Sequence, residues 1–265
     1  MRSLSPVGLL ALACTFAAQL SAQSTPKSGD EVLQRMHDAY AGKWYRTLTF
    51  VQKTTRYRPD GTKNVSTWFE SLEHAGPGAT RLRIDVGDPS AGNGMLYTAD
   101  STTRFSAGKV TSAQSGGNEF LPMIEGVYMQ PVARTVAELK ETGIDMTKVT
   151  KADWQGRPAW IVGVTAAADT TSPQFWIDIE RNVVVRMIIK PAPNTGPMDI
   201  HLDGYVPLDR GWLATKIAMS ANGKPLQTEE YFEYKANVDL PKAMFDPISW
   251  ITAPHWAKGH PPVLP

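Results

Sequence analysis

Residues 44–54 read WYRTLTFVQKT, a pattern that indicates a β-strand. Trp44, Leu48 and Phe50 stand at even positions, and threonine, valine and tyrosine fill most of the positions between them. Aromatic and β-branched residues with a period of two are typical of a strand that has one apolar face. Asp60-Gly61 follows, a dipeptide that favours the tight turn of a hairpin. The stretch therefore predicts the first strand of an antiparallel sheet.

The same pattern returns along most of the chain. Short turns such as Glu180-Arg181-Asn182 and Asn222-Gly223 separate neighbouring strand candidates. Because consecutive antiparallel strands pair with one another, one continuous curved sheet in a single domain over residues 23–265 is favoured over two domains. Further strands are predicted at residues 66–72, 81–86, 95–99, 102–105, 159–164, 174–179, 183–189, 198–205, 212–220 and 228–236.

Charged residues on three of these strands are interpreted as solvent-facing. In residues 81–86 and 198–205 they alternate with apolar side chains, which is the pattern of a sheet with one face on a core and one face in water. For the acidic and histidine positions of residues 198–205, a metal or acid–base cluster is the less favoured alternative. The residues concerned are Arg81, Arg83, Asp85, Asp199, His201, Asp203, Glu229, Glu230 and Glu233.

Two segments have the spacing of helices. Ser28 and Glu31 fit a capping box, and Val32, Met36 and Tyr40 then fall four apart on one face, as in an amphipathic helix. A helical insert is predicted at about residues 118–142, where Phe120, Ile124 and Val127 share one face and Pro131 can open a second helix.

The first 22 residues have the layout of a secretory signal peptide. Arg2 is followed by an apolar run from Val7 to Leu20 and by the small residues Ser21 and Ala22. The run is shorter than the roughly 20 residues that a membrane-spanning helix needs. Cleavage after Ala22 and export to the periplasm are therefore expected. The alternative is a lipoprotein signal, which would leave the protein anchored through an acylated Cys14.

The charge and the cysteine count exclude several classes of site. The chain has 27 Lys+Arg and 26 Asp+Glu, and loss of Arg2 with the leader leaves 26 − 26 = 0. Nucleic-acid binding is not expected, because it needs a dense basic surface. Cys14 is the only cysteine, so the mature chain has no disulfide, thiolate nucleophile or zinc–thiolate site.

Motifs of catalysis are missing from the sequence. There is no G-x-S-x-G nucleophile turn, no P-loop and no G-x-G-x-x-G loop. His255 and His260 lie in a Pro-rich C-terminal tail, about residues 247–265, and are interpreted as solvated tail residues instead of metal ligands. No catalytic residue, metal or cofactor is predicted, and the protein is not expected to be an enzyme.

The strands carry many aromatic residues, which could fill a solid core or line a hollow half-barrel. The residues alone favour the core. These aromatic residues are Trp44, Phe50, Trp68, Trp160, Phe175, Trp176, Trp212, Tyr231 and Phe232.

Several short motifs resemble periplasmic LolA-type lipoprotein carriers. Leu48 to Thr54 is similar to the first strand of that family, and Phe175-Trp176-Ile177-Asp178 with the following strand resembles a segment shared by LolA, LolB and RseB-like sensors. Val238 to Phe245 resembles the closing segment of the family. The strand with Trp68, the stretch Gly76-Pro77-Gly78 and the segment from Met95 to Phe105 follow the same order. The resemblance spans roughly residues 30–247.

The resemblance implies an α+β fold: a curved antiparallel sheet that forms an open, incomplete β-barrel, lidded by a few helices over an apolar cavity for acyl chains. An acylated lipoprotein or lipid is the implied ligand, a protein of the inner or outer membrane is a further expected partner, and a monomer is expected. The expected cavity-lining residues are Trp44, Leu48, Phe50, Trp68 and Leu72, and the expected lid residues are Phe120, Ile124 and Val127.

One departure from the family keeps other functions open. LolA-type carriers have an arginine beside a proline that helps to latch the lid, whereas residues 75–80 read AGPGAT. Lipid or lipoprotein trafficking to the outer membrane is therefore weighed against an RseB-like periplasmic sensor that binds a partner protein. A hydrolase that uses a pair of carboxylates brought together by the fold is a third interpretation.

Overall fold

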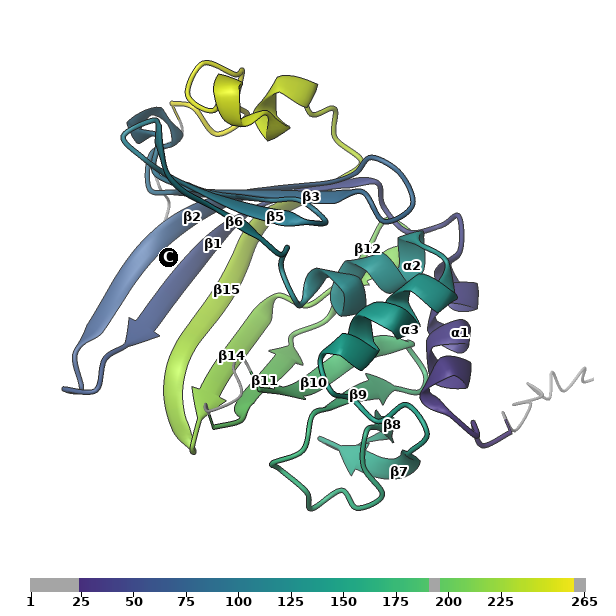
Figure 1. Ribbon diagram of the computed structural model, residues 1–265. Coiled ribbons are helices and arrows are strands. Elements are labelled where there is room, and N and C mark those ends of the chain that lie inside the picture. Colours follow the sequence, from purple (N-terminus) through teal and green to yellow (C-terminus); the bar gives the residue numbers. More distant parts are fainter. Residues whose placement is uncertain (1–23, 191–195, 260–265) are drawn as a thin grey trace, which may run out of the picture.

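The computed structural model describes residues 24–190 and 196–259, in which thirteen strands form one antiparallel sheet. The sheet curls around the helices without closing, since β6 and β7 remain as its two free edges (Figure 1). The order of the strands is β6-β5-β4-β3-β2-β1-β15-β14-β11-β10-β9-β8-β7. The predicted fold class, an open and incomplete barrel with a few helices, is confirmed. The predicted leader at residues 1–22, with Cys14, lies outside the described residues.

The elements follow one another with short connections. The strands are β1 (Thr47–Tyr57), β2 (Lys63–His74), β3 (Thr80–Val86), β4 (Gly94–Tyr97), β5 (Ser101–Ser106), β6 (Lys109–Ser115), β7 (Val149–Trp154), β8 (Arg157–Val162), β9 (Gln174–Asp178), β10 (Val183–Ile189), β11 (Met198–Asp203), β14 (Lys216–Ala221) and β15 (Lys224–Ala236). A separate two-stranded ribbon joins β12 (Val206–Leu208) to β13 (Gly211–Leu213). The helices are α1 (Gly29–Tyr40), η1 (Pro89–Ala91), η2 (Pro122–Gly126), α2 (Val127–Met129), α3 (Val132–Glu141), η3 (Lys242–Phe245) and η4 (Pro247–Ser249).

Long central strands and bulges give the sheet its curvature. β1 lies between β2 and β15, although β15 comes last in the chain, so this pairing joins the two halves of the sheet. The register shifts between Thr49 and Val51 on β1 and between Val184 and Arg186 on β10. A bulge adds local twist and bends the strand that carries it, and the sheet therefore wraps around a concave face.

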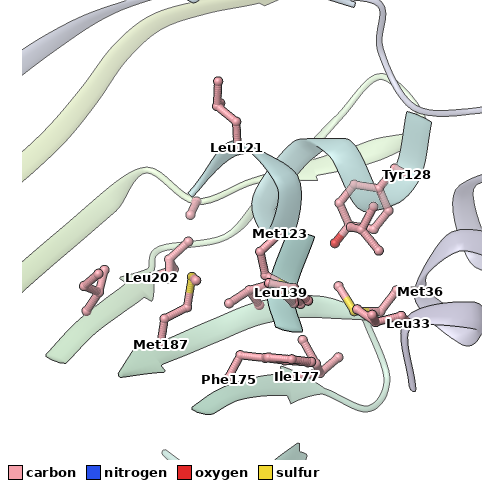
Figure 2. Packing of buried hydrophobic residues seen from close by; sticks show 14 of the residues in the cluster. Leu33, Met36, Leu121, Met123, Tyr128, Leu139, Phe175, Ile177, Met187 and Leu202 are labelled. Carbon is pink, nitrogen blue, oxygen red and sulfur yellow. The ribbon is translucent and has the colours of Figure 1, made fainter. Parts of the chain in front are cut away.

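Four helical segments lie over one part of that concave face (Figure 1). The N-cap of α1 is Ser28, whose Oγ accepts from the backbone N–H of Glu31 at 3.4 Å. The Glu31 carboxylate accepts from the backbone N–H of Lys27 at 2.9 Å, one residue earlier than in a capping box. The segment η2–α2–α3, which falls within the predicted insert, packs with α1 over β9–β11, and Figure 2 shows Met123 and Leu139 above Phe175 and Ile177.

Three strands were not expected from the sequence. β6 and β7 are the edges of the sheet, and their polar sequences KVTSAQS and VTKADW show little apolar alternation because few of their side chains meet the core. The short β12 was not predicted, because its three residues are too few to show an alternating pattern. The predicted strand at residues 212–220 is wrong as a single element, because the chain leaves the ribbon at β13 and enters the main sheet at β14.

The C-terminal segment, residues 241–257, covers the convex face of β1–β5. Met244 and Trp250 pack on Leu96 and Phe105, and the Trp250 and Phe105 rings stack with centroids 4.0 Å apart. The interpretation of Arg83 and Asp85 as solvent-facing is therefore wrong, because this segment excludes water from both side chains, which are 0% exposed. Arg81, at the end of the strand, is half-buried and pairs with Glu73.

A buried charge network fastens this segment to the sheet. The Arg83 guanidinium donates two hydrogen bonds to Asp85, at 2.7 and 2.8 Å, and two more to the carbonyls of Met244 and Trp250, at 3.1 and 2.9 Å. His255 Nε2 lies 3.0 Å from Asp85 Oδ2, so the interpretation of His255 as a solvated tail residue is wrong. His260 lies outside the described residues. Burial alone would raise the pKa of Asp85, but the hydrogen bonds from Arg83 and His255 outweigh it and lower the pKa.

We predict that Arg83→Met destabilises the protein by about 3–5 kcal/mol, because it leaves the Asp85 carboxylate buried without the guanidinium group that pairs with it. Urea denaturation measures the free energy of unfolding. Arg58→Met, which truncates an exposed arginine beyond the end of β1, is the matched control and should change that free energy by about 0.5 kcal/mol or less. Equal effects of the two substitutions would contradict the assigned role of the network.

Candidate ligand-binding cavity

A cavity of about 320 Å³ lies between the concave face of the sheet and the helical lid, η2 with its flanking residues 118–121 and α2. Its volume falls at the lower end of the range of small-molecule sites, about 300–1,000 Å³. Strands β1–β5, β10, β11, β14 and β15 contribute to its walls. The lining side chains include Trp44, Tyr45, Leu48, Phe50, Arg56, Trp68, Glu70, Leu72, Leu82, Ile84, Tyr97, Arg104, Phe120, Leu121, Ile124, Glu125, Gln227, Glu229 and Tyr231.

The five residues expected to line a cavity are brought together along its wall. Leu48 pairs with Leu72 across β1 and β2, and Phe50 lies two residues further along β1 on the same face. Trp68 lies on that face of β2, and Trp44 closes the end beneath the lid. The period of two places the four strand residues there, because alternate side chains of a strand share one face, whereas Trp44 precedes β1 in a bend.

Two of the three expected lid residues also line the cavity. Phe120 and Ile124 face the concave sheet from the segment that leads into and through η2. Val127 does not line it, because its side chain is fully buried between the lid and α1. Its carbonyl oxygen lies 2.9 Å from His37 Nδ1 of α1, so Val127 joins the two helical segments.

The lid is anchored through a carboxylate that the sequence analysis did not single out. Glu125 of η2 accepts from Trp44 Nε1 at 2.8 Å and from the Tyr45 hydroxyl at 2.7 Å. His74 Nε2 of β2 lies 3.3 Å from the same carboxylate. Burial, followed by the charge of Glu125, raises the pKa of Tyr45 well above its usual value and keeps this hydroxyl a donor. The lid therefore rests on the sheet through an acidic residue of the lid itself.

The cavity changes from apolar to polar along its length. Leu48, Leu72 and Leu82 line the part beneath the lid, and Leu121 of the lid lines the same cavity. Further along β2 and β15, the walls include Glu70, Glu229, Tyr231 and Gln227. Arg56 and Arg104 follow at the outer end, and both are exposed. An amphiphile would fit this gradient, with its chain beneath the lid and its polar group toward the mouth.

Glu229 lies in the cavity wall and is not exposed to solvent as the sequence predicted. It was interpreted as part of a wet sheet face, whereas it lines the cavity and is 7% exposed. Its carboxylate accepts from the Tyr231 hydroxyl at 2.8 Å and from Gln227 Nε2 at 2.5 Å. Its neighbour Glu230 points to the other face and pairs with Lys53 at 3.4 Å, and Glu233 is exposed as expected.

The acidic and histidine positions of β11 do not form a metal site. Asp199 receives two hydrogen bonds from Arg186, at 2.9 and 2.7 Å, which occupy both of its carboxylate oxygens. The Arg186 guanidinium lies near the faces of Trp154 and Trp176, so this side of the sheet is half-covered instead of open to water. Within residues 24–190 and 196–259, no group of three or more His, Cys, Asp or Glu side chains could hold a metal ion.

No helix among the described residues is long and apolar enough to cross a membrane.

The fold is shared with solved proteins whose sequences are only distantly similar. No protein-family model and no curated protein matches the sequence. A solved DUF1329 family protein from Desulfovibrio piger superposes with a TM-score of 0.56 at 11% identity and covers 82% of this chain and 95% of its own. A domain from Vibrio parahaemolyticus, named for outer membrane lipoprotein sorting, superposes with a TM-score of 0.56 at 10% identity and covers 84% of this chain and 98% of its own.

A LolA superfamily protein from Nitrosomonas europaea has a TM-score of 0.48 at 10% identity and covers 82% of this chain and 97% of its own. The two likenesses above a TM-score of 0.5 show a shared fold. The resemblance to LolA-type carriers noted in the sequence is therefore confirmed at the level of the fold.

We predict that Glu125→Leu loosens the lid. Trp44, Tyr45 and His74 would lose their shared partner inside a dry site, at a cost of about 1–3 kcal/mol for each buried donor left unpaired. Hydrogen–deuterium exchange should accelerate across residues 120–129. Glu138→Leu is the matched control, because Glu138 bonds only Gln130 and Arg134 within the insert. Unchanged exchange in Glu125→Leu would contradict the anchoring role.

Proposed function

We propose that this protein is an exported, non-enzymatic carrier that holds the acyl chains of a lipid or lipoprotein in the cavity and takes part in trafficking toward the outer membrane. The apolar part of the cavity beneath an anchored lid is the observation that carries the proposal. The fold it shares with a domain named for outer membrane lipoprotein sorting supports it.

The energetics of the cavity suit binding by shape and apolar area. Each methylene moved from water into an apolar site contributes about 0.8 kcal/mol, so ten of them contribute about 8 kcal/mol before the cost of association. No covalent step is needed to hold such a chain. Entry and release would require the lid to move, and Glu125 is the side chain on which that movement depends.

A carboxylate-dependent hydrolase fits the geometry less well. Glu70 and Glu229 lie on opposite sides of β1, and they face Phe50 and Thr54, four residues apart on that strand. At about 3.3 Å per residue this offset is about 13 Å between the backbone positions of the two residues. A catalytic pair needs one carboxyl group that stays ionised, whereas burial raises the pKa of both groups and so favours the protonated form of each.

Filling the cavity tests the proposal directly. We predict that Leu48→Trp leaves the melting temperature within a few degrees of the wild type and abolishes uptake of a fluorescent fatty-acyl probe, because the larger ring projects into the space beneath the lid. Val51→Trp is the matched control on the same strand. Val51 packs against Phe69 and Ala257 on the convex face, where overpacking costs about 1–3 kcal/mol.

The proposal fails if the wild type never binds the probe, or if Leu48→Trp unfolds the protein while Val51→Trp does not. Co-purification of wild-type protein with one stable protein partner and no extractable lipid would instead support the partner-binding sensor.

Localisation rests on the leader. We expect periplasmic fractions to contain a mature chain that begins at Gln23, with the N-terminus identified by mass spectrometry. An N-terminal acylated Cys14 in the membrane fraction would contradict this expectation and make the protein a membrane-anchored relative of LolB.

A further inference from the structure

Glu70 lines the cavity without a cationic side chain as its direct neighbour on β1 or β3. It lies in the middle of β2, is 5% exposed, and faces Phe50 on β1 and Ile84 on β3. No hydrogen bond reaches its carboxyl group from any residue that the structure describes. A buried polar group without a partner destabilises a fold. A carrier of purely apolar chains would be more stable with leucine at this position.

The groups around Glu70 offer acceptors instead of donors. Gln52 lies on the same face of β1, between Trp68 and Tyr231, and its Oε1 atom is buried without a hydrogen-bond partner. Its Nε2 atom is already committed to Thr54 Oγ1, at 2.8 Å. On β15, the Tyr231 hydroxyl is committed to Glu229. A ligand placed beside Glu70 would therefore have to supply the donors.

The cationic groups of the cavity stand further out. Arg56 is exposed, donates to Gln227 Oε1 at 3.0 Å and lies over the Trp68 ring. Arg104 is exposed on β5, near the edge of the sheet. The other titratable groups that line the cavity with Glu70 are carboxyl and phenol groups: Glu125, Glu229, Tyr45, Tyr97, Tyr128, Tyr205 and Tyr231. None of these is a cation, so the only cations in this lining are Arg56 and Arg104.

We propose that Glu70 is the binding subsite for a primary ammonium group of an amphiphilic ligand, with the chain of the ligand beneath the lid. This inference rests on the proposed function and specifies the chemical class of its ligand. An ammonium group supplies three donors and a positive charge at a carboxyl group to which no described residue donates a hydrogen bond. A carboxylate or phosphate head would be held back at the arginines of the mouth, where less of its chain is buried.

Binding is coupled to a proton. Burial, and then the charge of Glu229, raises the pKa of Glu70 well above its usual value, which favours the protonated form in the empty cavity. The ammonium group would bind the carboxylate form, so the O–H bond of the Glu70 carboxylic acid breaks, its proton leaves for solvent, and no other bond changes. The affinity for an amine should therefore rise with pH until Glu70 ionises in the empty protein.

The test compares three ligands of one chain length. Dodecylamine, dodecanol and dodecanoate are titrated against the protein at pH 7 with a neutral fluorescent apolar probe already bound. We predict that dodecylamine displaces the probe at least tenfold more tightly than the other two. Glu70→Gln, which keeps the shape of the side chain, should remove most of that advantage. Glu230→Gln is the matched control, because Glu230 faces away from the cavity on β15 and should leave the preference intact.

The outcomes separate this inference from the proposed function. Failure of the wild type to bind the probe defeats the carrier itself. Binding of the probe with equal displacement by the three ligands, or a preference for dodecylamine that survives in Glu70→Gln, overturns the ammonium subsite and leaves the carrier in place. Calorimetry in buffers of different ionisation enthalpy should detect proton release when dodecylamine binds, and its absence would also count against the subsite.

Stability provides an independent readout. The raised pKa of Glu70 gives a contribution to stability that is present below the ordinary glutamate pKa and is lost as pH rises through the folded-state value. Glu70→Leu should therefore raise the melting temperature of the empty protein by a few degrees at pH 8 and flatten its pH dependence. A lower melting temperature in Glu70→Leu would assign Glu70 a structural role and overturn the inference.

Discussion

A single curved sheet cannot bury either of its own faces, and this constraint organises the whole molecule. The convex face of β1–β5 is covered by the C-terminal segment, which Arg83 holds through Asp85 and two backbone carbonyls. The concave face is covered by α1 and the helical insert. The two covers differ in kind. The first is dry and carries a satisfied charge network, whereas the second leaves a space of about 320 Å³. That difference separates the solidly packed face of the sheet from the face to which the proposed function is assigned.

The lid stays in place by a mixture of apolar packing and one polar anchor. Packing of Met123 and Leu139 on β9–β11 is non-directional, so it tolerates small movements of the insert. The contacts of Glu125 with Trp44, Tyr45 and His74 are directional and buried, so they define one closed position. A lid built in this way has a distinct closed state without being locked. The polar anchor of the closed position is thus an acidic residue of the lid itself.

Alternation along the strands was enough to predict the sheet and the side chains that share a face, because a period of two assigns each side chain to a face whatever lies opposite. That a cavity lies along this face was implied only by the family resemblance. It could not identify what covers each face. Arg83 and Asp85 alternate with apolar residues in the same way as a wet strand, and the segment that buries them is about 160 residues further along the chain. Glu229 was misinterpreted for the same reason, since a polar cavity wall and a solvated face have one pattern. The edge strands β6 and β7 were not predicted, because few of their side chains contact the core and their sequences therefore show little apolar alternation.

Ligand chemistry lies in the few polar residues that interrupt the apolar wall. A shared fold at 10–11% identity transfers the curved sheet and its lid, both of which depend on patterns that many sequences satisfy. It does not transfer Glu70, whose side chain is determined by this chain alone. A protein under selection for stability would lose an unpartnered carboxyl from its interior, because most replacements by an apolar residue of similar size would stabilise it. The presence of Glu70 in the cavity wall is thus better explained by a role in binding a ligand than by a contribution to the stability of the fold.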